Sequence, residues 1–272
     1  MLSHAMRRIH FEVTDSTNTQ ARLLAAAHPG ERLLVTAAEQ TAGRGRHGRQ
    51  WISPRGGAWL TIAWPMRSAP PTYRAASLAA AVGVRRALVE LLVRGMPPEA
   101  TSFAPRPLIK WPNDLLIDDA KVVGILCEQS LGSASSSNVI FIGIGVNVAF
   151  DQSLLDELPG GEALRHRATT LSNAVGRAIE VEEAVGLVSQ EVAAALEQLE
   201  ARGLAGMTAG RPSLLDELRG SLAYVGSRRT WLSPRGEISG RIVGIDDDGR
   251  LLLDDGHGIL ACDAGELSGG DA

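Results

Sequence analysis

The sequence predicts an α+β protein in which a larger domain of mixed strands and helices precedes a small all-β domain. Up to about residue 210, short apolar strands alternate with Ala/Leu-rich helical segments. From Tyr224 onward only short strands follow, separated by Asp-Gly and His-Gly turns. The chain has 272 residues, of which 44% are hydrophobic, so it is long enough to bury a core in each part. We expect the two domains to span residues 1–215 and 216–272.

The larger domain is predicted to begin with a strand, a helix and two further strands. Ile9–Val13 is a short strand, and the polar residues Asp15–Asn18 precede an Ala/Leu-rich run that ends at Ala27. Polar residues at such a position cap the N-terminus of a helix. The apolar segments Leu33–Glu39 and Ala58–Trp64 are the next two strands.

The middle of the chain predicts a long helix, a loop that contains four prolines, and four strands. The helix spans Thr72–Arg94 and the loop spans Gly95–Pro107. The Asp118-Asp119 pair indicates a tight turn between two strands of a hairpin. The apolar side of the helix is expected to hold Leu78, Val82, Leu88, Val89 and Leu92. The other expected elements are strands at Leu108–Trp111, Leu115–Ile117, Lys121–Gln129 and Val139–Val148, a Ser/Gly loop at Gly132–Ser137, and a largely helical segment at Glu162–Gly203.

The sequence pattern changes from helical to strand-like around Pro212–Gly220, and the remaining residues predict a small β-barrel of roughly 50 residues. Short strands with tight turns between them are typical of such a barrel. The expected strands are Tyr224–Arg229, Glu237–Ile245, Leu251–Asp254 and Ile259–Asp263.

Composition and charge argue against several function classes. The net charge is -4, whereas a nucleic-acid-binding domain is usually basic. No run of about 18 apolar residues is present, so we expect no membrane span, and the N-terminus lacks the apolar run of a signal peptide. Cys127 and Cys262 are far apart in apolar contexts and are expected to be reduced. We therefore expect a cytoplasmic protein.

The segment Thr41–Trp51 is the most informative feature of the sequence. Within Gly43–Arg49, seven residues include three glycines and three arginines. Glycines allow the backbone to approach a ligand closely, and guanidinium groups bind phosphate or carboxylate in a bidentate way. Such a loop buries no apolar surface and its charges repel one another, so we expect it to become ordered around an anion.

Three further segments are candidates for a ligand site, although each also has a plainer explanation. Lys110–Asp114 reads Lys-Trp-Pro-Asn-Asp, which places polar groups at the end of a strand but is also compatible with a solvated Pro-Asn turn. Lys121 either lies in the same cleft or ends a hairpin in solvent. Gly143–Asn147 combines glycines that permit close approach with an amide, or it is a strand bulge. Ser16–Asn18 is a binding segment or a simple helix cap.

Taken in order and with their spacing, these segments closely resemble the biotin–protein ligases. The resemblance is carried by Asp15–Asn18, by Glu39–Thr41 running into Gly43–Trp51, by Lys110–Asp114, by Lys121 with Gly124–Leu126, and by Gly143–Val148. It extends from about Phe11 to the C-terminus. The small β domain corresponds in position and size to the SH3-like C-terminal domain of that family, and the larger one to its mixed-sheet catalytic domain.

The resemblance implies an ATP-dependent ligase, a biotin–[acetyl-CoA-carboxylase] ligase, with a two-step reaction. The biotin carboxylate attacks the α-phosphate of ATP, which gives biotinyl-5′-AMP and pyrophosphate. A lysine of the biotin carboxyl carrier domain of acetyl-CoA carboxylase, or of a related carboxylase, then takes up the biotinyl group. Mg²⁺ is expected with ATP. The ligands of the metal stay unassigned at this point.

The resemblance also implies roles for individual residues. Charge that develops on the phosphoryl oxygens is stabilised by preorganised cations. Lys121 would contact the reacting carboxylate and the α-phosphate, and Arg46 would close over the ligand with its loop. The expected catalytic set is Lys121, Arg46, Arg49, Lys110 and Asp114, with Asp114 supporting the metal or the attacking lysine. The expected biotin-binding set is Ser16, Thr17, Asn18, Gln40, Arg44, Gly45, Arg46 and Lys121. The expected nucleotide-binding set is Arg49, Trp51, Asn113 and Asn147.

The remaining expectations concern partners. Some members of the family carry an N-terminal DNA-binding module; here the catalytic domain starts near Met1, so we expect no DNA binding and no repressor role. A homodimer is possible. In Gly160–Arg167, where adenine-covering residues are expected, there is no tryptophan.

Two alternative functions stay open at this point. Lipoate–protein ligases and octanoyl transferases are related and share the core architecture, although the arginine-rich loop and the Lys-Trp-Pro-Asn-Asp segment argue against them. The second alternative is a nucleic-acid-binding protein that uses the arginine loop. The acidic net charge and the lack of interleaved aromatic residues argue against it.

Overall fold

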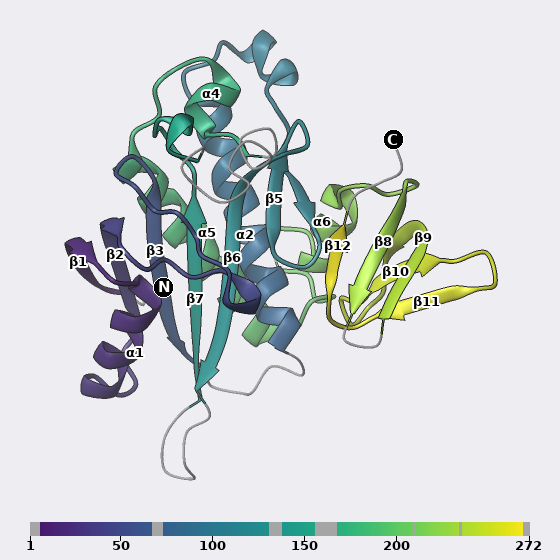
Figure 1. The fold of residues 1–272 in the computed structure, drawn as a ribbon, viewed down its shortest axis with the longest axis horizontal. Coiled ribbons are helices and arrows are strands. Elements are labelled where there is room, and N and C mark those ends of the chain that lie inside the picture. The colour runs from purple at the N-terminus through teal and green to yellow at the C-terminus, as the bar shows by residue number, and fades with distance from the viewer. Residues whose placement is uncertain are drawn as a thin grey trace.

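The computed structural model describes residues 6–66, 73–130, 138–155, 168–208, 210–233 and 236–268, and within this part the chain forms two sheets (Figure 1). A seven-stranded mixed sheet belongs to the first part of the chain, and a five-stranded antiparallel sheet belongs to the last part. The predicted α+β fold with a small C-terminal β domain is therefore confirmed. The predictions for Gly132–Ser137, Gly160–Arg167 and the first residues of Glu162–Gly203 lie outside the described residues.

The seven-stranded sheet has the order β1-β2-β3-β7-β6-β5-β4. Strand β1 runs parallel to β2, and every other described neighbour pair in this sheet is antiparallel. Its strands are β1 (Arg7–Thr14), β2 (Leu33–Gln40), β3 (Ala58–Pro65), β4 (Leu108–Lys110), β5 (Asp114–Ile117), β6 (Ala120–Ser130) and β7 (Val139–Val146). The Asp118-Asp119 turn between β5 and β6 has positive φ at both residues, as a two-residue hairpin turn of type I′ requires.

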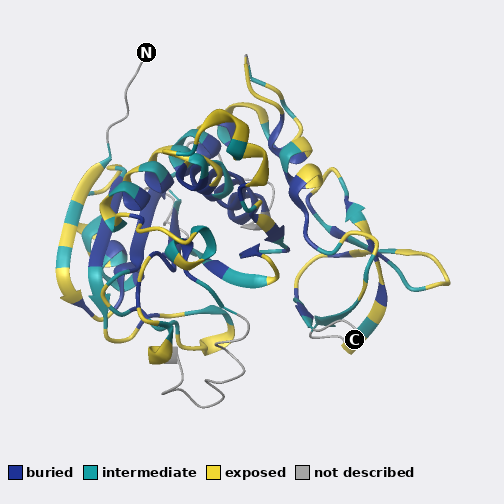
Figure 2. Cartoon of the chain, turned by 90° about the horizontal axis from the view of Figure 1, so that it is seen from above, coloured by how far each residue is buried: buried dark blue, intermediate teal, exposed yellow. Residues whose placement is uncertain are grey.

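Helices cover both faces of this sheet, which is why its central strands are apolar on both sides. Helix α1 (Thr17–Ala27) packs over β2, β3 and β7. Helices α2 (Tyr73–Val93) and α5 (Val181–Arg202) lie on the opposite face and pack tightly against each other. Figure 2 shows the buried residues concentrated on the strands and on the helix sides that face them. The binding segments found in the sequence are thereby attached to a rigid layer.

Three details of the helices differ from the sequence predictions. Val89 is 39% exposed, so it does not belong to the buried side of α2. A 3-10 helix, η2 (Pro98–Phe103), lies inside the predicted proline-rich loop. The described part of the predicted helical segment after residue 162 consists of a short helix, α4 (Leu171–Val175), and of α5, with Gly176 in the left-handed conformation between them. A second short 3-10 segment, η3 (Gln152–Leu155), follows β7.

The C-terminal part begins with a helix that the sequence analysis missed. Helix α6 (Leu214–Ser221) is capped by Ser213, whose side chain accepts a hydrogen bond from the backbone N–H of Asp216. The sheet that follows has the order β11-β10-β9-β8-β12. Its strands are β8 (Arg228–Ser233), β9 (Gly236–Ile245), β10 (Leu251–Asp254), β11 (Ile259–Cys262) and β12 (Glu266–Ser268). Strand β8 starts later than predicted because Tyr224 has a positive φ and belongs to a turn, and β12 was not predicted.

The two sheets are joined through buried contacts. Helix α6 packs on α2 and α5 of the larger part and also on β9, and the predicted boundary between residues 215 and 216 falls inside it. The indole of Trp111, which is 1% exposed, donates a hydrogen bond to the carbonyl of Gly249 between β9 and β10. The Lys-Trp-Pro-Asn-Asp segment is therefore fixed directly to the C-terminal sheet.

Candidate functional site

The arginine-rich loop between β2 and β3 lies across the middle of the large sheet, in front of β7 and β6 (Figure 1). Arg44 and Gln50 form an isolated antiparallel bridge, and the N–H of Trp51 donates to the carbonyl of Gly43. A Cβ atom on Gly43 would lie 2.3 Å from the carbonyl oxygen of Trp51, so this position requires glycine. The 3-10 turn η1 (Arg46–Gly48) forms the tip of the loop. Contrary to the expectation of a shapeless free loop, the loop has a definite hairpin-like form.

Trp51, at the end of this loop, lies flat on two glycines of the sheet. Cβ atoms built on Gly124 and Gly145 would lie 2.7 Å and 2.4 Å from atoms of the indole. A Cβ on Gly143 would similarly lie 2.3 Å from the side-chain oxygen of Asn18. Strand β7 pairs regularly with both neighbours at these glycines, so the alternative of a strand bulge is wrong. The glycines admit the protein's own side chains to the sheet.

We expect Gly145→Ala to displace Trp51 from the sheet, to cost about 1–3 kcal/mol of stability by overpacking, and to reduce the activity of the site. Gly186→Ala is the matched control, because Gly186 is exposed on α5 with open space around its Cβ position. That change should leave activity intact and stabilise the helix slightly. Activity assays and thermal unfolding of both variants test this. Full activity of Gly145→Ala would show that the position of Trp51 is unimportant.

Lys121 forms the centre of the candidate catalytic group. Its ammonium nitrogen lies 2.7 Å from Oδ1 of Asp114 and 5.0 Å from the centre of the Trp51 ring. The antiparallel pairing of β5 with β6 creates this arrangement, because Asp114 begins β5 and Lys121 of β6 pairs with Leu116, two residues after Asp114 on the same strand. The Lys121 side chain remains 32% exposed. A cation oriented by a carboxylate and still accessible is suited to contact an anionic ligand.

Arg46 connects the loop to the same group and to the C-terminal sheet. Its guanidinium donates to the side-chain oxygen of Asn113 at 2.9 Å and to the carbonyl of Gly265 at 3.2 Å. Burial lowers the pKa of Arg46, and the nearby carboxylates of Glu266 and Asp114 oppose that shift. A half-buried guanidinium whose hydrogen bonds go mainly to neutral oxygens can still pair with a ligand anion.

Arg49 and His47 face the C-terminal sheet. Arg49 forms an ion pair with Glu266 at the start of β12, and His47 lies 3.7 Å from the same carboxylate. Sequence analysis missed Gly265 and Glu266, because a short strand with one acidic residue carries no signal of a site. The arginine loop is thus held from both sheets.

The two predicted adenine residues are engaged in internal hydrogen bonds. Asn113 accepts from Arg46 and donates to the carbonyl of Ile125 at 3.0 Å. Asn147 is 5% exposed and donates to the carbonyl of Thr169 at 3.1 Å and, at 3.5 Å, to that of Lys121. In the structure, the side chain of Asn113 holds Arg46 and the backbone of Ile125, and the side chain of Asn147 contacts the backbone carbonyl of Lys121.

Lys110 ends β4 and pairs in register with Asp114. Lys110 and Lys121 are the only lysines in the sequence. The two lysines belong to the strands on either side of β5, and both lie at Asp114: Lys110 pairs with it in register, and Lys121 forms an ion pair with it.

A chain of neutral polar side chains lies beside this charged group. Thr17, Asn18 and Ser16 are all less than 5% exposed at the start of α1. Oε1 of Gln40 accepts from the backbone N–H of Thr17 at 2.8 Å, and its Nε2 donates to Ser53 at 2.7 Å. Ser16 occupies the N-cap position, yet its hydroxyl makes no capping hydrogen bond. The hydroxyl is thus not used by the helix, which favours a binding role over a simple cap.

Two members of this polar chain were missed by sequence analysis. Thr61 of β3 is fully buried and donates to Oδ1 of Asn18 at 2.5 Å, with Oγ1 of Thr17 2.8 Å away. Ser53 follows the arginine loop and contacts Gln40. A threonine in an apolar strand and a serine before a proline are common outside binding sites, so neither carried a sequence signal.

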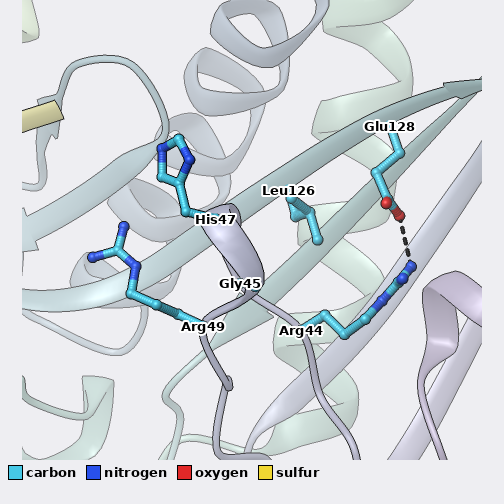
Figure 3. Close-up of a pocket in the computed structure, with 7 residues that line it drawn as sticks. Arg44, Gly45, His47, Arg49, Leu126 and Glu128 are labelled. Atoms are coloured by element: carbon cyan, nitrogen blue, oxygen red, sulfur yellow. Dashed lines mark hydrogen bonds and ion pairs between the residues drawn. The ribbon is translucent and has the colours of Figure 1, made fainter. Parts of the chain in front are cut away.

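A pocket opens between the tip of the arginine loop and strand β6 (Figure 3). Glu128 of β6 and Arg44 of the loop face each other across it and form an ion pair at 2.9 Å. Arg49 and His47 come from the far side of the loop. The full lining is Arg44, Gly45, His47, Gly48, Arg49, Leu126 and Glu128.

Within the described ranges, no group of three or more His, Cys, Asp or Glu residues is arranged to hold a metal ion. Asp114 is the carboxylate that pairs with Lys121. None of the helices in the described part of the chain is both long and apolar enough to cross a membrane.

Comparison with known proteins places these features in a family context. Residues 10–147 match the model of the biotin/lipoate A/B protein ligase family, and residues 230–268 match the biotin protein ligase C terminal domain. A biotin–[acetyl-CoA-carboxylase] ligase of Paracoccus denitrificans is 33% identical, over 88% of this chain and 91% of the relative. The Mycobacterium tuberculosis enzyme of the same name is 30% identical, over 94% and 86%.

Solved structures show the same similarity. The biotin protein ligase from Aquifex aeolicus in complex with biotin and ATP has a TM-score of 0.73 and 25% identity, and covers 96% of this chain and 97% of that one.

Proposed function

Because the chain belongs to the biotin/lipoate A/B protein ligase family, we propose that it activates biotin as biotinyl-5′-AMP and transfers the biotinyl group to a carrier lysine. The observation that carries the proposal is the ion pair between Lys121 and Asp114, with Arg46 beside it. The series of neutral polar side chains described above lies next to this charged group. A cationic centre beside neutral donors and acceptors suits a ligand with one carboxylate and one ureido ring. The proposed reaction belongs to residues 1–215, with residues 216–272 contributing Glu266.

In the first step a carboxylate oxygen of biotin attacks the α-phosphorus of ATP, and the bond to the departing pyrophosphate breaks. Negative charge then accumulates on the phosphoryl oxygens. Lys121 is proposed to stabilise this charge, and the proposal is supported by its ammonium being oriented by Asp114 and partly exposed. Arg46 supplies a second, half-buried cation from the loop.

The neutral polar chain is proposed to bind the ureido ring of biotin. That ring presents one carbonyl oxygen and two N–H groups, so it needs both donors and acceptors. Ser16 offers a hydroxyl that the helix does not use, and Gln40 and Thr17 add an amide and a second hydroxyl. The backbone around Arg44 and Gly45 would line the other side of the ring. Lipoate lacks such a ring, and this difference favours biotin as the acid.

The nucleotide is proposed to lie on the side of the site that faces the C-terminal sheet. Arg49 and Lys110 would meet its phosphates, and Trp51 offers an aromatic surface. Asn113 and Asn147 would form hydrogen bonds with the adenine through the donor and acceptor positions that their internal hydrogen bonds do not use. Mg²⁺ is usually bound through one or two carboxylates together with substrate phosphates, and Asp114 fits that donor set. When bound, it would neutralise phosphate charge.

In the second step the amino group of a carrier lysine attacks the carbonyl carbon of the mixed anhydride, and AMP leaves. The proposed carrier is the biotin carboxyl carrier domain of acetyl-CoA carboxylase or of a related carboxylase, and the proposed location is the cytoplasm. Because the anhydride is sensitive to water, the arginine loop is proposed to cover it between the two steps.

The proposal is tested by pyrophosphate release with ATP and Mg²⁺ in the presence of biotin, lipoate or octanoate. We expect release with biotin and, within the background of the assay, none with the other two acids. Release with lipoate or octanoate instead would assign the chain to the other branch of the family, and no release with any of them would exclude the proposed function.

A further inference from the structure

Glu128 of β6 is a carboxylate with three polar contacts, which tie the ureido-binding chain to the arginine loop. Its Oε2 accepts from Nδ2 of Asn18 at 2.9 Å and from the guanidinium of Arg44 at 2.9 Å. Its Oε1 lies 3.2 Å from the guanidinium of Arg22. The side chain is 24% exposed and also lines the pocket below the loop (Figure 3).

The contact with Asn18 decides which way the amide of that residue is turned. An asparagine side chain has a donor end and an acceptor end of almost the same shape, so its partners determine its orientation. A carboxylate only accepts, and therefore Nδ2 of Asn18 faces Glu128 while Oδ1 faces the hydroxyl of Thr61. Thr61 in turn lies beside Thr17, which contacts Gln40. The carboxylate thus fixes the direction of hydrogen bonding at one end of the polar chain.

The contact with Arg44 fixes the base of the loop to the same carboxylate. Arg44 is the first arginine of the loop and forms the bridge with Gln50 that gives the loop its hairpin form. Oε2 of Glu128 accepts hydrogen bonds from both Asn18 and Arg44. A movement of Asn18 when a ligand binds would therefore also displace Arg44 of the loop. Arg22, on α1, holds the other oxygen and keeps the carboxylate in place.

We propose that Glu128 is a positioning residue for biotin, which sets the polarity of the ureido site through Asn18 and anchors the arginine loop through Arg44. This inference rests on the proposed function. The proposal predicts that Glu128 fixes the orientation of the Asn18 amide by accepting one of its two Nδ2 hydrogens. The other Nδ2 hydrogen remains to be donated to a carbonyl oxygen of the ligand. Glu128 itself does not touch the ligand.

The test compares Glu128→Gln with Glu191→Gln. Glu191 is a matched control, because it also bridges two arginines, Arg86 and Arg211, and its side chain is 12% exposed, but it lies on α5 away from the site. We expect Glu128→Gln to raise the Kd for biotin about tenfold, which corresponds to about 1.4 kcal/mol. The Kd is measured by calorimetry in the absence of nucleotide. The KM for ATP should change less than about threefold. Glu191→Gln should lower the melting temperature at least as much and leave biotin binding unchanged.

A double-mutant cycle identifies the route of the effect. If Glu128 acts through Asn18, then Glu128→Gln adds little on the background of Asn18→Ala, and the two losses are not additive. Glu128→Asp, which keeps the charge, should recover part of the affinity. Unchanged biotin binding in Glu128→Gln, or equal losses for biotin and ATP, would overturn the inference. A wild-type chain that binds no biotin would instead refute the proposed function on which it rests.

Discussion

Lys121→Met is expected to lower the rate of biotin-dependent pyrophosphate release by about 10²–10³-fold, the usual effect of removing one preorganised group that stabilises developing charge. Methionine keeps the apolar length of the side chain over Trp51 but removes the ammonium that pairs with Asp114. The loss should appear mainly in kcat, because the developing phosphoryl charge is largest in the transition state.

Two controls separate this chemical effect from a structural one. Lys121→Met leaves the carboxylate of Asp114 without its ion pair, so the variant should lose some stability. Adding Asp114→Asn should restore the melting temperature and not the rate. Arg229→Met removes another cation that lies over an aromatic ring, 4.1 Å from the centre of Tyr224, and should leave the rate unchanged. A rate for Lys121→Met within about tenfold of wild type would remove Lys121 from the catalytic group.

Arg46→Gly is expected to release the activated intermediate, so that lysines of bystander proteins become labelled. The side chain of Arg46 joins the loop to Asn113 and to Gly265, and the glycine variant loses both contacts. The loop then covers the site for a smaller fraction of the time. Labelling of serum albumin by the variant, with ATP and biotin present, measures the leak; we expect it to rise at least about tenfold above wild type.

Arg55→Gly is the matched control for this experiment. Arg55 lies just beyond the loop and pairs with Glu12 and Glu39, with 59% of its side chain exposed. Its removal should leave labelling confined to the carrier. Strict carrier specificity in the Arg46→Gly variant would show that the loop does not retain the intermediate.

The elements and the charged residues of the site could be predicted from sequence, because their signals are local. Polar residues before an Ala/Leu run predict the start of α1, and alternating apolar segments predict β2, β3 and β7. Helix α6 had a signal as well: Ser213 is followed three residues later by Asp216, a capping pattern, but the segment is short and follows a proline. Strand β12 has three residues, too few for a periodicity.

The missed residues act through contacts between distant segments. Glu128 is a charged residue in a strand, which in sequence is read as the solvated end of that strand, and only the fold brings it to Asn18 and Arg44. In the sequence, Thr61 cannot be distinguished from any other β-branched residue of a strand. Glu266 lies 217 residues from its partner Arg49. Such pairs depend on tertiary packing, so no local pattern predicts them.

The scarcity of lysine in this chain has a practical consequence for chemical labelling. Amine-directed acylating reagents modify most proteins at many surface positions, yet here they have two side-chain targets besides the chain's terminal amine. Both targets lie beside Asp114, and Lys121 is the proposed catalytic cation. A general reagent therefore becomes a reporter of a single site in this protein, and protection by nucleotide or biotin could be read directly from the mass of two peptides. Attachment to a solid support through lysine, by the same reasoning, would block the reaction.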